Sequence, residues 1–225
     1  MPDQDDEVPA WQRRTEGESR LAATLAVLAI VVLQVALPKE LRPQPAWLLP
    51  ALEILLLCVL VVANPFRLDR EERWLRNGGL LLTALVSVAT AVSANRLVFG
   101  LIDGTLSDKP AALLGSGGAV WLTNVVVFGL WYWEFDRGGP AARAHARKPL
   151  PDFLFVQMQN PELAKPEWEP QFMDYLYLSF TNATAFSPTD VMPMSRWAKA
   201  MMMVQSAVSL SLVILVIARA INVLN

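Results

Sequence analysis

The chain has 225 residues, of which 54% are hydrophobic and 18% charged, with a net charge of −2 at pH 7. Five apolar stretches approach the roughly 17–25 residues that a membrane-spanning helix needs: residues 21–37, 46–63, 78–102, 118–135 and 198–223. The remaining length excludes a separate soluble domain, and no basic-aromatic patch suits nucleic acid. The sequence therefore predicts an all-α membrane protein with five transmembrane helices.

Lysine and arginine are distributed unevenly between the two sides of such a protein. If the N-terminus is cytoplasmic, 14 of them lie on the cytoplasmic side and 4 on the other, while Arg96 falls inside the third span. Cytoplasmic loops carry the excess of basic residues. We therefore expect a cytoplasmic N-terminal tail at residues 1–20, a four-helix transmembrane region at 21–135 and a C-terminus outside the plasma or inner membrane.

The loop between the second and third spans carries Arg67, Arg70, Arg73 and Arg76, interleaved with acidic residues. A voltage sensor needs its arginines inside an apolar helix, whereas these lie between helices. We interpret residues 65–77 as a solvated cytoplasmic loop.

Two charged residues fall inside predicted spans. Glu53 lies six residues into the second span, and Arg96 lies six residues before the end of the third. In neighbouring antiparallel helices both would lie about 9 Å from a helix end, at 1.5 Å per residue. Charges inside a membrane are usually paired, so we predict an ion pair that serves as a structural tether or in ion transport.

The longest polar connection follows the fourth span. It contains six prolines, which forbid a long helix, and its aromatic residues suit a segment that lies against lipid headgroups. We expect residues 136–171 to form a proline-rich interfacial linker.

Residues 172–225 combine a short amphipathic helix, a polar turn and a membrane helix. Residues 174–180 can form two helical turns, residues 181–193 are too polar and broken to continue across lipid, and residues 198–218 are almost uncharged. Non-helical backbone at membrane depth is tolerated only where protein or a water-filled cavity satisfies it. The pattern predicts a re-entrant loop between the fourth and fifth spans, lining a polar path.

This segment resembles the pore module of the potassium-channel superfamily, over about a fifth of the chain. Aligned without a gap, the pore helix corresponds to Tyr177-Leu-Ser-Phe180 and the filter Thr-Thr-Val-Gly-Tyr-Gly-Asp to Thr184-Ala-Phe-Ser-Pro-Thr-Asp190. The proline after the filter corresponds to Pro193, and the end of the inner helix to Val216-Ile-Ala-Arg219. The turn SFTNATAFSPTD also resembles that of uncharacterised prokaryotic integral membrane proteins. The resemblance implies a homotetramer that surrounds a pore in the lipid bilayer.

The filter departs from the family where its two glycines stand. Ser187 and Thr189 occupy these positions, and Pro188 between them fixes φ near −65°. Left-handed backbone costs an L-residue roughly 1–2 kcal/mol, on the order of 8–16 kcal/mol for two sites in four subunits. That rivals the stability of an ordinary domain, about 5–15 kcal/mol. We therefore expect no carbonyl cage of the potassium type.

Side-chain oxygens are the alternative filter ligands. Rings of Ser187, Thr189 and Asp190 around an axis would favour cations, although Asp190 could instead cap backbone N–H groups in a local turn. The candidate filter and pore lining is Thr184, Ala185, Phe186, Ser187, Pro188, Thr189 and Asp190.

The re-entrant loop enters the membrane from outside in potassium channels. The distribution of basic residues here instead predicts entry from the cytoplasm, as in channels of the glutamate-receptor type.

On the last span Met202, Gln205 and Ser209 share one face. This stripe either faces a pore or serves helix–helix packing, which favours small and hydroxyl residues in membranes.

Nothing in the sequence supports catalysis, a metal site or a cofactor. His145 is the single histidine and Cys58 the single cysteine. Two functions remain open: an oligomeric channel-like protein that passes cations or another small ion, and a non-conducting membrane protein that uses the pore-loop fold for assembly, sensing or scaffolding.

Overall fold

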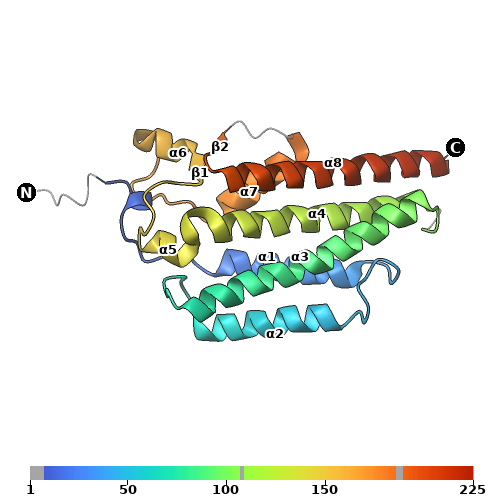
Figure 1. The fold of residues 1–225 in the computed structure, drawn as a ribbon, viewed down its shortest axis with the longest axis horizontal. Helices are drawn as coiled ribbons and strands as arrows, with labels where there is room; N and C mark the ends of the chain where they lie inside the picture. The colour runs from blue at the N-terminus through green and yellow to red at the C-terminus, as the bar shows by residue number, and fades with distance from the viewer. Residues whose placement is uncertain (1–7, 107–108, 186–189, 225) are drawn as a thin grey trace, which may run out of the picture.

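The computed structural model describes residues 8–106, 109–185 and 190–224. Within them, most of the chain forms helices that run along one long axis (Figure 1). The six longest helices are α1 (Leu21–Ala36), α2 (Leu48–Ala63), α3 (Arg73–Ile102), α4 (Pro110–Phe135), α7 (Phe172–Ala185) and α8 (Arg196–Leu224).

The shorter elements gather at one end of the bundle, on the left in Figure 1, which we call the loop-rich end. Strands β1 and β2 pair there as an antiparallel ladder in which Phe153 lies opposite Pro193. These elements are η2 (Ala10–Gln12), η3 (Asp136–Gly138), α5 (Pro140–Ala144), β1 (Phe153–Phe155), α6 (Val156–Gln159), η4 (Pro161–Leu163) and β2 (Val191–Pro193). The loop 37–47 and the residues 103–106 after α3 lie at the opposite end, the far end.

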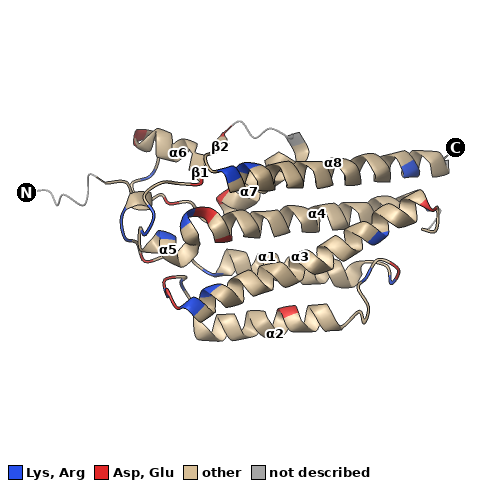
Figure 2. Ribbon diagram, in the orientation of Figure 1, with Lys and Arg blue, Asp and Glu red and all other residues tan. Residues whose placement is uncertain are grey.

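Each predicted span coincides with a helix, but the helix lengths differ. Three helices are long and apolar enough to cross a membrane: Arg73–Ile102, Pro110–Gly138 and Arg196–Val223. Helices α1 and α2 are apolar but have only 16 residues each, about 24 Å against a hydrocarbon core of about 30 Å. Charged residues concentrate toward the two ends, with few along the helices (Figure 2). These properties agree with a helical membrane protein.

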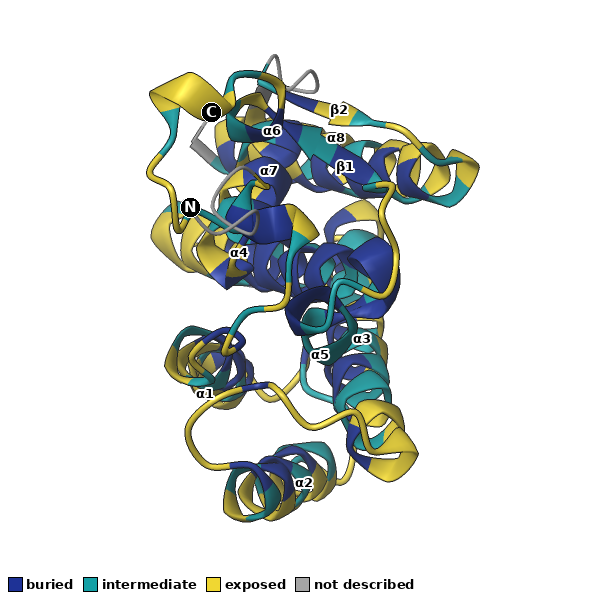
Figure 3. Ribbon diagram, turned by 90° about the vertical axis from the view of Figure 1, so that its left-hand side faces the viewer, coloured by how far each residue is buried: buried dark blue, intermediate teal, exposed yellow. Residues whose placement is uncertain are grey.

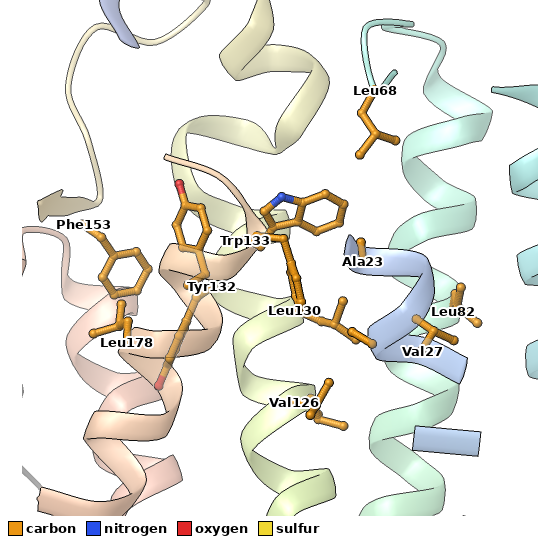
Figure 4. Close-up of a cluster of buried hydrophobic side chains, with 14 of the residues drawn as sticks. Ala23, Val27, Leu68, Leu82, Val126, Leu130, Tyr132, Trp133, Phe153 and Leu178 are labelled. Carbon is orange, nitrogen blue, oxygen red and sulfur yellow. The ribbon is translucent and has the colours of Figure 1, made fainter. Parts of the chain in front are cut away.

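Helix α4 is central. The α7–α8 pair lies on one side of it and α1, α2 and α3 lie on the other (Figure 3). Side chains of α4 pack on both sides. Leu130 and Trp133 point toward α1 and α3, while Tyr132 packs against Phe153 on the other side (Figure 4). At Gly129 an added Cβ would lie 3.2 Å from the Cα of Leu176, so the glycine lets α7 approach α4 closely.

Helix α7 is longer than predicted, because it includes Thr181 and Thr184, which we expected in the polar turn. The hydroxyl of Thr181 donates to the carbonyl of Tyr177 at 3.0 Å, and that of Thr184 to the carbonyl of Phe180 at 2.9 Å. Such bonds to the preceding turn satisfy hydroxyls within a helix. The polarity of this segment therefore does not end the helix before Ala185.

The chain makes a hairpin around α7. Helix α7 begins at the loop-rich end and runs beside the first part of α8, and Val191–Pro193 is back at the loop-rich end in the ladder with β1 (Figure 1). The segment 136–171 contains only elements of three to five residues in the structure. It delivers the chain from the end of α4 to the start of α7.

Candidate functional site

The candidate site is helix α7 with the faces of α4 and α8 that hold it. Near its start, the Tyr175 hydroxyl donates to Asp136 Oδ2 at 2.6 Å. One turn further, the Ser179 hydroxyl donates to the carbonyl of Val125 on α4 at 2.6 Å. Tyr175 and Ser179 are both fully buried, so α7 is attached to α4 by hydrogen bonds that solvent does not reach.

Gln205 of α8 is the centre of a deeper network. Its Oε1 accepts from the Tyr132 hydroxyl at 2.6 Å and from Asn182 Nδ2 at 2.8 Å. Its Nε2 donates to the carbonyl and the hydroxyl of Ser179 at 2.9 and 2.6 Å. An amide side chain has two donors and two acceptor positions, and here all four are used. Gln205 therefore joins α4, α7 and α8 at one point.

The network continues away from the loop-rich end. Asn182 also donates to the carbonyl of Met202 at 3.0 Å and accepts from the Ser206 hydroxyl at 3.2 Å. Asn124 of α4 donates to the Ser209 hydroxyl at 3.3 Å. Interhelical hydrogen bonds and close packing drive helix association in lipid. This set of bonds fixes the position of α7 relative to both long helices.

The predicted polar stripe of α8 faces the other helices of the same chain. Met202 is 8% exposed, and Gln205 and Ser209 are fully buried, with hydrogen bonds to α4 and α7. Within a single chain these side chains take part in helix–helix packing, and the pore-facing interpretation stays a prediction about an assembly of copies. The outward face of α8 is mostly apolar; its exposed large hydrophobic side chains are Met203, Val204, Leu210, Val213, Ile214, Ile217 and Ile221.

Three of the seven candidate filter residues lie within the described part of the chain. Thr184 is exposed, with its hydroxyl bonded inside α7, and Ala185 ends the helix. Asp190 is partly buried and is hydrogen-bonded to the side chain of Tyr177. The chain is thus back beside the first turns of α7 by Asp190. Phe186, Ser187, Pro188 and Thr189 lie outside the described residues.

Buried charges, which the sequence analysis did not single out, fix the start of α7. The Arg143 guanidinium donates to the carbonyls of Trp133 and Asp136 at 2.6 and 3.1 Å, and lies 3.8 Å from Glu18 Oε2. Glu18 accepts from Trp133 Nε1 at 2.7 Å and from the backbone N–H of Phe172. Burial raises the pKa of the Glu18 carboxyl, and the charge of Arg143 opposes this shift.

Two neighbouring carboxylates join this cluster to the strands and to α8. Asp136, fully buried, accepts from the backbone N–H groups of Asp152 and Phe153 at 2.8 and 3.3 Å. The carboxylate of Asp152 accepts from the backbone N–H of Arg137 at 3.0 Å and from Trp197 Nε1 at 2.8 Å. The signal in the sequence was the run Trp-Glu-Phe-Asp-Arg at the end of an apolar stretch, which places three charges where lipid ends.

Glu53 and Arg96 have partners other than each other. The carboxylate of Glu53 is fully buried and accepts from Gln34 Nε2 of α1 at 3.3 Å. Arg96 donates to the carbonyl of Arg42, in the loop at the far end. The predicted ion pair is not among the contacts of the described residues. Arg96 reaches out of the apolar layer, as long basic side chains do.

The described residues hold no group of three or more His, Cys, Asp or Glu that could bind a metal ion. His145 is partly buried, with its Nδ1 2.9 Å from the carbonyl of Ala141, and Cys58 is exposed on α2.

Comparison with protein-family models, curated proteins and solved structures finds no match to this chain.

Proposed function

We propose that this chain is the subunit of an oligomeric, channel-like membrane protein that passes cations or another small ion. The observation that carries the proposal is the hairpin around α7. A short helix begins at the loop-rich end and packs against both α4 and α8, and the chain is back at that end by β2, before the long apolar helix α8 begins.

This order of elements is what the resemblance to potassium-channel pore modules leads us to expect, with α4 as outer helix, α7 as pore helix and α8 as inner helix. The hydrogen bonds of Ser179 and Asn182 hold α7 against α4 and α8. The outer face of α7 is uncovered in a single chain, since Met173, Tyr177 and Phe180 are 60, 54 and 46% exposed. Neighbouring copies in a homotetramer would cover this face.

The filter would consist of side-chain oxygens of residues 184–190, with Asp190 supplying the charge. A ring of carboxylates concentrates cations and repels anions. Gln205 and Ser209 are hydrogen-bonded within one chain. In the assembled channel, the exposed apolar face of α8 would therefore line the pore beyond the filter. The excess of basic residues at the loop-rich end supports an entrance to the filter on the cytoplasmic side, since cytoplasmic loops carry most lysines and arginines.

A non-conducting scaffold is the second candidate, and the polar network is the observation that favours it. The side-chain amides of Asn182 and Gln205 are bonded within one chain, so α7 can be stable without a water-filled path. In that case the hairpin serves to shape the surface on which copies or other membrane proteins assemble.

Ion flux into liposomes that contain the purified full-length chain distinguishes the two candidates. For the channel we expect an oligomer in solution, cation flux, and a several-fold loss of flux or of cation selectivity in Asp190→Asn. Asp103→Asn is the matched control, because Asp103 is exposed at the far end, and it should conduct like the unchanged protein. The channel proposal is wrong if the oligomer passes no ion tested, or if Asp190→Asn behaves like the control.

A further inference from the structure

A cavity of about 330 Å³ lies at the loop-rich end, outside the α7 site. Its walls are the loop between α2 and α3, the first turn of α3 and the turn after α4. Four arginines line it, three of them from a loop that the sequence analysis interpreted as merely solvated. They are Arg20, Arg70, Arg73 and Arg76.

Three of these arginines are hydrogen-bonded to backbone carbonyls. Arg20 Nη1 donates to the carbonyls of Leu60 and Asn64 at 2.8 and 2.9 Å, and Arg70 Nη1 donates to that of Ala63 at 2.8 Å. Arg76 donates to the carbonyl of Gly138. A guanidinium has five N–H donors, and a carbonyl carries no net charge. Three of the four guanidinium groups are thus positioned by backbone and keep donors for a ligand.

Arg73 differs from the other three. Its side chain is exposed at the start of α3, and it has no hydrogen bond or ion pair with the described residues. Like Arg70, which is also exposed, it lines the cavity and is open to solvent.

Two acidic residues also line the cavity, and neither cancels this charge. Glu71 is bound at both oxygens by Arg147, at 2.9 and 2.6 Å, from outside the lining. These hydrogen bonds lower the pKa of Glu71, so its charge is matched by Arg147. Glu134 is buried, with Arg143, Arg76 and Arg20 as the nearby positive charges. The lining keeps a net positive charge.

The cavity lies where apolar helices meet the charged end of the bundle. Phe66 and Trp74, on either side of the loop arginines, are 82 and 50% exposed. Exposed aromatic residues next to apolar helices are typical of the headgroup layer of a membrane. Basic pockets between membrane helices on the cytoplasmic side bind anionic lipid headgroups, and the planar guanidinium matches a phosphate with two parallel hydrogen bonds.

We propose that this cavity binds a phosphate group, carried by the headgroup of an anionic phospholipid. Arg70 and Arg73, whose side chains are exposed, contact the phosphate, while Arg20 and Arg76 supply further positive charge from the lining. The proposal needs only that the helices lie in a membrane, and it is independent of whether the protein conducts ions.

The test uses the full-length chain in a neutral detergent and measures the midpoint of thermal unfolding. Phosphatidylglycerol, phosphatidylcholine and inorganic phosphate are added at matched concentration. A ligand that binds the folded protein raises this midpoint by mass action. We expect phosphatidylglycerol to raise it clearly and phosphatidylcholine to leave it unchanged. An equal rise with inorganic phosphate would show that a free phosphate is the ligand and overturn the lipid source.

Two variants locate the effect. Arg70→Gln/Arg73→Gln should lose the rise with phosphatidylglycerol, whereas Arg67→Gln should keep it. Arg67 belongs to the same loop but pairs with Glu16 at 3.1 Å outside the cavity lining. If the double variant does not fold, Arg73→Gln replaces it, because this change removes no hydrogen bond or ion pair among the described residues. The proposal fails if the pocket variant and Arg67→Gln respond alike, or if both lipids have the same effect.

Discussion

The two sides of α4 are held together by different interactions. On the α7–α8 side, Ser179, Asn182 and Gln205 form hydrogen bonds with α4 and with one another in the middle of the bundle. On the α1–α2 side the helices meet mainly through apolar side chains. Between α1 and α2, the side chains of Gln34 and Glu53 form a hydrogen bond. The layers are visible from the loop-rich end in Figure 3.

This difference matters because apolar contact alone does not drive helices together in lipid. Lipid tails are as apolar as leucine, so close packing and interhelical hydrogen bonds decide which helices associate. The α7–α8 side has such bonds along much of α7. The α1–α2 side instead has polar anchors at its ends, where Arg20 binds the carbonyls at the end of α2 and Arg96 binds the loop before α2.

The largest expected effect comes from removing the charge that fixes the start of α7. Arg143→Met leaves the buried carboxylate of Glu18 without its cation, and breaking one partner of a buried pair costs about 3–5 kcal/mol. Unfolding of the purified protein in detergent measures the loss. Glu18→Gln/Arg143→Met should recover part of it. Arg147→Met, which removes an exposed pair with Glu71, is the control and should have little effect.

If Arg143→Met is no more destabilising than Arg147→Met, the buried cluster does not anchor α7. The same outcome would remove the distinction between the two sides of α4 at the loop-rich end.

A smaller effect is expected in the middle of the α7–α8 side. Gln205→Leu removes four hydrogen bonds and leaves Asn182 and Ser179 with fewer partners. Interhelical hydrogen bonds in membranes average about 0.6 kcal/mol, so we expect a loss of about 2 kcal/mol. Ser211→Ala is the matched control on α8, because Ser211 is exposed and, among the described residues, its hydroxyl donates only to the carbonyl of Ala207 in the same helix. Equal stability of the two variants would contradict a stabilising network.

The positions of the long helices could be predicted from the sequence, because an apolar run long enough to cross lipid has few alternatives to a helix. The ends were less accurate. Helix α4 begins at Pro110, eight residues before the predicted span, and α3 takes in Arg73 and Arg76 from the predicted loop. The charged first turn of α3 carries no apolar signal, and the glycines Gly115 and Gly117 weaken the helical signal in the first turns of α4.

Side-chain partners were beyond the sequence for a different reason. Helical spacing correctly placed Met202, Gln205 and Ser209 on one face of α8, but spacing does not say which neighbour that face meets. The position of a side chain in a helical bundle depends on its depth along the helix and on the direction in which it points from the helix axis, and sequence spacing gave only the depth. Glu53 and Arg96 were predicted at similar depths, and the rotation of each helix about its own axis decides that Glu53 meets Gln34 instead.

The smallest expected effect is on the α1–α2 side, at Glu53. Its Oε2 has no hydrogen-bond partner among the described residues, and a buried carboxylate without a cation gains nothing from its charge. Glu53→Gln keeps the shape and the contact with Gln34, so we expect the free energy of unfolding to change by less than about 1 kcal/mol. An ion pair with Arg96 would instead make either single change cost about 3–5 kcal/mol. The test measures the free energy of unfolding of Glu53→Gln, Arg96→Gln and the double variant. Strong coupling between the two changes would mean that charge stabilises the α1–α2 side. Small, independent effects would mean that packing and the polar bonds at the helix ends are sufficient.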